Sequence, residues 1–102
     1  MKESRYATRL RGVILKLYGV ESKYLETVPV KETFNDQTVW EGAVEVFSLI
    51  DHPKATRCYA WAYTDDKGME QTTAVLELPP VTSPQSAVQV AIASEIKNKR
   101  AI

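Results

Sequence analysis

The chain has 102 residues, of which 44% are hydrophobic and 25% are charged. This length suits one hydrophobic core, and the composition differs from the low hydropathy and high charge of disordered chains, so we expect a single folded domain over residues 1–102. Thirteen basic and thirteen acidic residues give a formal net charge of zero, so the net charge does not guarantee long-range attraction to polyanions or membranes.

The charges are nevertheless unevenly distributed along the chain. Residues 1–20 carry five basic residues and one acidic residue, a net +4, and residues 95–102 carry three and one, a net +2. The stretch between them holds five basic and eleven acidic residues, a net −6. We divide the domain into a basic N-terminal segment, 1–25, and an α+β core, 26–102.

The single cysteine, Cys58, excludes an internal disulfide and a zinc site of thiolates, and it favours a reducing compartment. The basic start of the chain is similar to that of a signal peptide, but Lys16 interrupts the apolar run 13–20 and no Ala-x-Ala cleavage site follows. That run is also far shorter than the ~18 apolar residues that span a bilayer. These features predict a cytoplasmic protein with no membrane partner.

The first predicted element is an amphipathic helix. Apolar side chains recur at helical spacing: Tyr6, Leu10, Val13, Ile14 and Leu17. Gly19 is placed to end the helix, and the opposite face carries Arg5, Arg9 and Lys16. Gly12 weakens a helix, and the β-branched pair Val13-Ile14 could equally begin a strand, so both alternatives remain open.

Residues 20–35 are less regular and predict a loop or an edge strand, because Pro29 excludes a central strand and Asn35-Asp36 favours a turn. Residues 38–47 predict a half-buried strand that is rich in β-branched and aromatic residues. Glu41 and Glu45 fall on one side of this strand. Trp40, Val44 and Val46 fall on the other.

Two further strands are predicted over 55–63 and 69–78, joined by a turn at Asp65–Gly68 into a hairpin. The ladder Tyr59-Trp61-Tyr63 is either a core or an exposed stacking platform for nucleic-acid bases. Pairing Tyr63 with Glu70 would place Tyr59 and Trp61 on the face of Ala74 and Leu76, whereas a three-residue loop would reverse that face. Because burying the larger apolar set is favoured, we predict a core.

The last predicted element is a helix that begins after Pro79-Pro80. Either Thr82 and Gln85 form a capping box, or Ser83 caps the helix with Pro84 in its first turn. Val88, Ala91, Ile92 and Ile96 line its apolar face. The chain is thus predicted to be an α+β fold: a three-stranded antiparallel meander, a C-terminal helix packed on one face, and an N-terminal helix.

We identify no catalytic residue, cofactor site or metal site. His52 beside Asp51 reads as a turn, Cys58 reads as a core residue, and Asp65-Asp66 lacks the ligand spacing of a calcium loop. The glycines are too far apart to form a phosphate-binding loop.

Several segments resemble a family of short uncharacterised bacterial proteins, over roughly residues 26–96. They are Glu26-Thr27-Val28-Pro29-Val30, Thr38-Val39-Trp40-Glu41-Gly42, Val44-Glu45-Val46-Phe47, His52-Pro53-Lys54-Ala55, Cys58-Tyr59-Ala60-Trp61, Pro79-Pro80-Val81 and Ser83-Pro84. The resemblance implies a bacterial cytosolic origin and no catalytic assignment. The first 25 residues lie outside it.

A stable scaffold without converging reactive groups predicts a non-catalytic interaction module, which binds a protein partner or a second copy of itself. The alternative is nucleic-acid binding through the basic end segments. That role would use Arg5, Arg9, Arg11, Lys16, Lys97, Lys99 and Arg100. A small enzyme built from scattered carboxylates is the third hypothesis.

Overall fold

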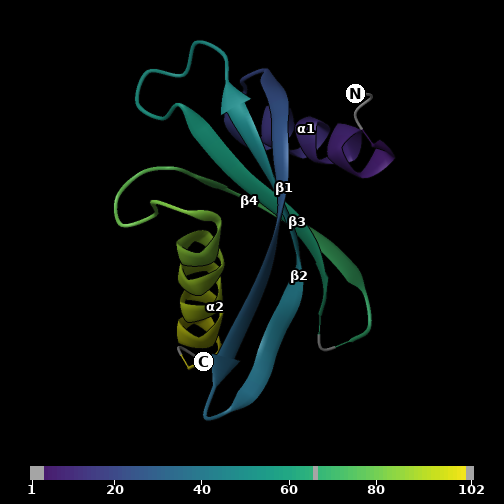
Figure 1. Ribbon diagram of the computed structural model, residues 1–102, viewed down its shortest axis with the longest axis vertical. Coiled ribbons are helices and arrows are strands. Elements are labelled where there is room, and N and C mark those ends of the chain that lie inside the picture. Colours follow the sequence, from purple (N-terminus) through teal and green to yellow (C-terminus); the bar gives the residue numbers. More distant parts are fainter. Residues whose placement is uncertain (1–3, 66, 101–102) are drawn as a thin grey trace.

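A computed structural model describes residues 4–65 and 67–100, without the side chains of Phe34 and of residues 94–100. Its elements are α1 (Arg5–Tyr18), β1 (Ser22–Phe34), β2 (Gln37–Leu49), β3 (Arg57–Thr64), β4 (Glu70–Leu76) and α2 (Pro84–Arg100). The strands form one antiparallel sheet in the order β1-β2-β3-β4 (Figure 1). The α+β fold is confirmed, with four strands in place of the predicted three. Within the described residues, no helix is both long enough and apolar enough to cross a membrane.

The additional strand is β1, which occupies most of the region predicted to be a loop or an edge strand. It lies at the edge of the sheet, where Pro29 faces Ala43 of β2. Asn35 and Asp36 join the two strands with φ values of 52° and 62°, the left-handed conformation of a two-residue hairpin turn. A register shift after Tyr24 leaves Leu25 unpaired, which breaks the alternation that a strand prediction needs.

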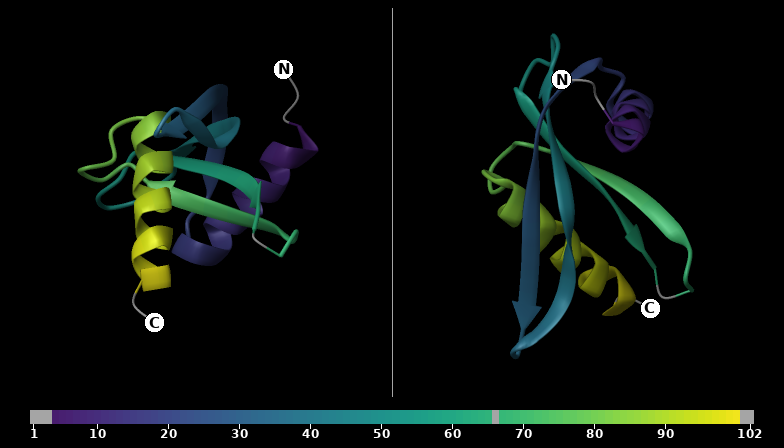
Figure 2. Two further views of the ribbon diagram at one scale, coloured as in Figure 1. Left: turned by 90° about the horizontal axis from the view of Figure 1, so that it is seen from below. Right: turned by 45° about the vertical axis from the view of Figure 1, so that its right-hand side comes forward.

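The two helices cover opposite faces of the sheet (Figure 2). α2 packs over the core cluster with Val44, Val46, Tyr59 and Trp61, which confirms the C-terminal helix on one face. α1 packs over a second cluster, in which Ala7, Leu10 and Ile14 contact Phe47, Cys58, Ala60 and Ala74. Because α1 covers this face, Glu45 is 4% exposed, although the sequence pattern placed it on the open side of a half-buried strand.

Both helix starts are capped by serine. The Ser4 side chain accepts a hydrogen bond from the Ala7 N–H at 3.0 Å, and Gly19 ends α1 with a φ of 68°. At α2, the Ser83 hydroxyl accepts from the Ser86 N–H at 3.1 Å, and the Ser86 hydroxyl accepts from the Ser83 N–H at 2.9 Å. Of the two predicted caps the structure therefore has the Ser83 cap.

The aromatic ladder of β3 belongs to the core, as predicted. Tyr59 and Trp61 are buried under α2, and the Trp61 ring lies 6.0 Å from the Trp40 ring. The register pairs Thr64 with Glu70, so the ladder lies on the face of Val75 instead of that of Ala74. Burial and the hydrogen bond to the Glu77 carboxylate together raise the pKa of Tyr59 to about 12.

Candidate interaction edges

The two hairpins of the sheet separate beyond a short shared region. β2 pairs with β3 over four residues, from Glu45 opposite Ala60 to Ser48 opposite Arg57. Both strands continue past Glu45 and Ala60, and the β1-β2 hairpin and the β3-β4 hairpin diverge there (Figure 1). The sheet therefore has two outer edges, and β2 and β3 are not paired with each other beyond Glu45 and Ala60.

The hydrogen-bonding pattern shows which backbone groups point to the outer edge of β4. The Glu77 N–H donates to the Arg57 carbonyl at 2.9 Å, across the β3-β4 pair. Antiparallel ladders alternate between bonded and non-bonded pairs, so the residues of β4 with the same parity as Glu77 bond to β3. Thr72, Ala74 and Leu76 have the opposite parity. Their N–H and C=O groups therefore point away from β3.

Tyr18 caps one of these outward groups. Its hydroxyl donates a hydrogen bond of 2.7 Å to the carbonyl of Ala74, on the outer edge of β4. Burial raises the pKa of Tyr18, whose hydroxyl is in any case protonated at neutral pH and able to donate. The Leu76 carbonyl also accepts a hydrogen bond, of 2.9 Å, from the Leu78 N–H, so two of the outward acceptors of β4 already have partners.

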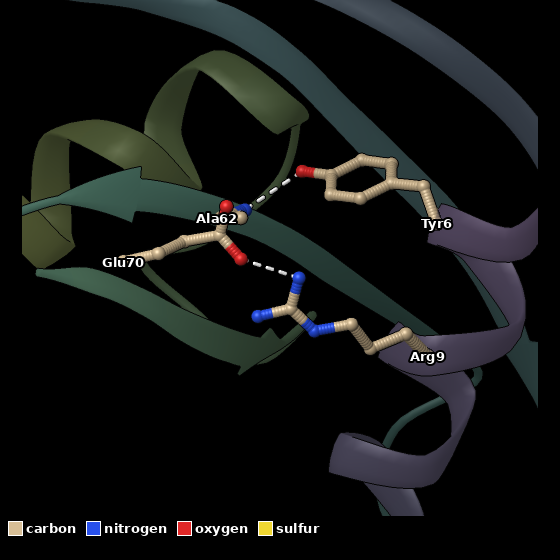
Figure 3. A network of polar contacts seen from close by, with 4 residues as sticks. All are labelled: Tyr6, Arg9, Ala62 and Glu70. Atoms are coloured by element: carbon tan, nitrogen blue, oxygen red, sulfur yellow. Dashed lines mark hydrogen bonds and ion pairs between the residues drawn. The ribbon is translucent and has the colours of Figure 1, made fainter.

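Tyr6 caps the inner edge of β3 in the same way. The N–H of Ala62 donates to the Tyr6 hydroxyl at 2.7 Å, just beyond the last pair with β2 (Figure 3). Continuing the β2-β3 register would place Ala62 opposite Ala43. The tyrosine hydroxyl thus replaces the strand neighbour that is lost where the hairpins diverge.

Polar contacts join α1 to the β3-β4 hairpin, and others lie within the β1-β2 hairpin. Arg9 forms an ion pair with Glu70, with both side chains at least half exposed (Figure 3). Such exposed pairs contribute about 0–1 kcal/mol. Within the β1-β2 hairpin, the Thr27 hydroxyl donates to the buried Glu45 carboxylate. The oxygen of that hydroxyl lies 2.6 Å from the Tyr24 hydroxyl oxygen. The buried carboxylate therefore has a hydrogen-bonding partner.

The two outer edges differ in how they are protected against pairing with other chains. β1 carries Lys23, Pro29, Lys31 and the unpaired Leu25, and charge, proline and bulges are the devices that block strand addition. Residues 71–76 of β4 have no charge and no proline, and their pairing with β3 is continuous. In the described part of the chain no strand lies beyond β4. The outer edge of β4 is the less protected of the two.

The residues considered for chemistry bind their own backbone or lie in the core. Nδ1 of His52 accepts from the N–H groups of Lys54, at 3.1 Å, and Ala55, at 2.9 Å. Asp65 accepts from the N–H group of Met69, the side-chain amide of Gln71 and the N–H group of Lys67, and these bonds lower the pKa of its carboxyl. Cys58 is buried, and burial raises its pKa to about 12. Over residues 4–65 and 67–100, no three His, Cys, Asp or Glu residues form a group that could hold a metal ion.

The basic residues of the two chain ends lie on different helices. Arg5 and Lys16 are exposed on α1, Arg9 is half exposed, and Arg11 is partly buried. Lys97, Lys99 and Arg100 lie in the last turns of α2, and their side chains are outside the described residues. Because the helices cover opposite faces, the two basic segments lie on different sides of the sheet.

The edge contacts of Tyr6 and Tyr18 were missed in the sequence. The periodicity of α1 assigns Tyr6 to its apolar face and does not include Tyr18, and each contact joins residues 56 positions apart. No local pattern predicts such a contact. No protein-family model, curated protein or solved structure matches this chain, so the resemblance to short bacterial proteins stays a prediction.

Proposed function

We propose that this chain is a non-catalytic interaction module that binds an extended segment of a protein partner along the outer edge of β4. The observation that supports the proposal is the backbone of this edge: Thr72, Ala74 and Leu76 direct their N–H groups outward, and Thr72 directs its carbonyl outward as well, without charge, proline or bulge to block pairing. Main-chain hydrogen bonds supply the affinity in this mode of recognition.

The neighbours of the edge define the chemistry of the partner. An added strand places alternate side chains beside Thr72 and Ala74 on the α1 face and beside Thr73 and Val75 on the α2 face. Uncharged β-branched residues suit these positions. An antiparallel strand ends near Glu70, where a basic residue is favoured. When the strand pairs along the whole edge, the Tyr18 hydroxyl must leave the Ala74 carbonyl and the Leu78 N–H must leave the Leu76 carbonyl.

A synthetic peptide tests the proposal. The probe is Thr-Val-Thr-Val-Thr-Val-Lys, titrated into isotope-labelled protein while backbone amide shifts are followed by NMR. We expect the shifts to concentrate at the outward N–H groups of Thr72, Ala74 and Leu76. Tyr18→Phe removes a competing hydrogen bond of about 1 kcal/mol and should tighten binding about fivefold. Tyr24→Phe removes a hydroxyl on β1 and is the matched control, with no expected change.

A second variant blocks the edge. Thr72→Pro removes an outward N–H while keeping every bond between β3 and β4, so the variant should fold, by circular dichroism, and lose the peptide. Peptide shifts located on β1, or unchanged binding in folded Thr72→Pro, would contradict the proposal. Analytical ultracentrifugation of the same variants shows whether a second copy of the chain supplies the strand.

A further inference from the structure

The first residue of α1 is a base, at a position where helix stability does not favour one. Arg5 is the first residue of the helix and Arg9 follows one turn later, while the first turn contains no acidic residue. The start of a helix carries a positive partial charge, so cations there are unfavourable and acids are preferred. Glu3, the nearest acid in the sequence, lies outside the described residues. Stability of α1 therefore does not explain Arg5, whereas Arg9 pairs with Glu70.

Gly12 is a second feature of α1 that folding does not require. It lies in the middle of the helix on the exposed side, and a Cβ added there would meet no atom within 4 Å. Glycine weakens a helix interior relative to alanine. A glycine on an exposed helix face lets a ligand approach the helix backbone closely, so ligand binding is a reason for glycine at this position.

The exposed face that contains Gly12 carries positive charge along its whole length. Residues 4–20 include no acid, and Arg5, Arg9 and Lys16 recur at spacings that keep them on one side of the helix. At about 1.5 Å per residue, Arg5 and Lys16 are about 16 Å apart along the axis. Glu70 pairs with Arg9 and offsets part of this charge.

We propose that this face of α1, defined by Arg5, Arg9, Gly12 and Lys16, binds the phosphate backbone of a nucleic-acid duplex. A duplex carries about one negative charge per 1.7 Å of its axis, so a face of about 16 Å spans several phosphates. The contacts are with phosphates and therefore carry no base specificity. The face lies on α1 and not on β4, so this inference is independent of the proposed strand addition.

Titration with labelled duplexes tests the inference. Full-length protein is added to fluorescein-labelled DNA and RNA duplexes of about 16 base pairs, between roughly 20 and 200 mM KCl, and anisotropy is measured. Three phosphate contacts predict a logarithmic salt slope near −2.7 on DNA, at about −0.9 per contact. The double variant Arg5→Gln/Lys16→Gln should weaken binding and reduce the slope to about −0.9.

Three further variants and one other polyanion serve as comparisons. Lys67→Gln changes an exposed base at the β3-β4 turn and should leave binding unchanged, as should Thr72→Pro. Gly12→Ala should raise the melting temperature while weakening duplex binding. No binding at high micromolar protein and low salt overturns the inference, as does a salt slope unchanged by the Arg5/Lys16 variant. Binding to polyglutamate in preference to both duplexes would also overturn it, and would identify an acidic protein as the ligand.

Discussion

Replacing Trp61 with alanine removes the largest aromatic ring of the core under α2. Trp61 is 3% exposed, and its ring contacts that of Trp40. A tryptophan buries about 150–250 Å². At about 25 cal/mol per Å², burial of this ring contributes about 4–6 kcal/mol, close to the cost of about 3–5 kcal/mol for aromatic-to-alanine changes in cores. Because domains of this size have stabilities of about 5–15 kcal/mol, the variant should lose a large part of its stability.

Urea unfolding, followed by circular dichroism and by the fluorescence of Trp40, measures this loss. With a slope of about 2 kcal/mol per M, the midpoint should fall by about 2 M. Val39→Ala, at an exposed position, is the control and should change stability by less than about 0.5 kcal/mol. Trp61→Phe keeps an aromatic ring and gives a measurable intermediate if the alanine variant does not fold. A loss below about 1 kcal/mol in Trp61→Ala would refute the core assignment and restore the stacking platform.

Three further predictions concern single positions. The Cys58 thiol should resist Ellman's reagent at about pH 8 until the protein unfolds, because it is buried and its pKa is raised to about 12; rapid labelling of native protein would contradict this. Gly42→Ala should cost about 1–3 kcal/mol in urea unfolding, because its Cβ would meet the Trp40 ring at 2.8 Å, whereas Gly12→Ala should stabilise the protein. Hydrogen bonds lower the pKa of Asp65 in the folded state, so the stabilisation from its carboxylate is present above the unfolded pKa and is lost as the pH falls through the folded pKa. In Asp65→Asn, the free energy of unfolding should therefore fall less steeply when the pH is lowered.

Local sequence patterns predicted those elements whose spacing, turn and capping residues lie within a few positions of one another. The spacing of Leu10 and Ile14, with Gly19 at the end, favoured a helix, and the structure decides between that helix and the alternative strand at Val13-Ile14 in favour of α1. The Asp65 turn likewise joins β3 and β4 as predicted. Ser83 caps α2, one of the two alternatives that the sequence left open.

The remaining features depend on contacts between distant segments. Whether one or both faces of a sheet are covered is decided by where the helices pack, so alternation in β2 alone could not place Glu45 under α1. The register of β3 and β4 reversed the face expected for Trp61, because a shift of one residue exchanges the two sides of a strand. The edge contacts of Tyr6 and Tyr18 exist only once α1 has packed on the sheet.

The order of strands in the sheet also bears on how the chain folds. Every strand pairs with the strand next to it in the sequence, so the sheet requires no crossover between distant segments. Sheets with such local pairing have a low contact order and fold faster than sandwiches that join distant strands. The long-range contacts come from the helices at the two chain ends, each packed on its own face. We therefore expect the hairpins of residues 22–76 to form the folding nucleus, with the contacts of the two helices completed after the transition state.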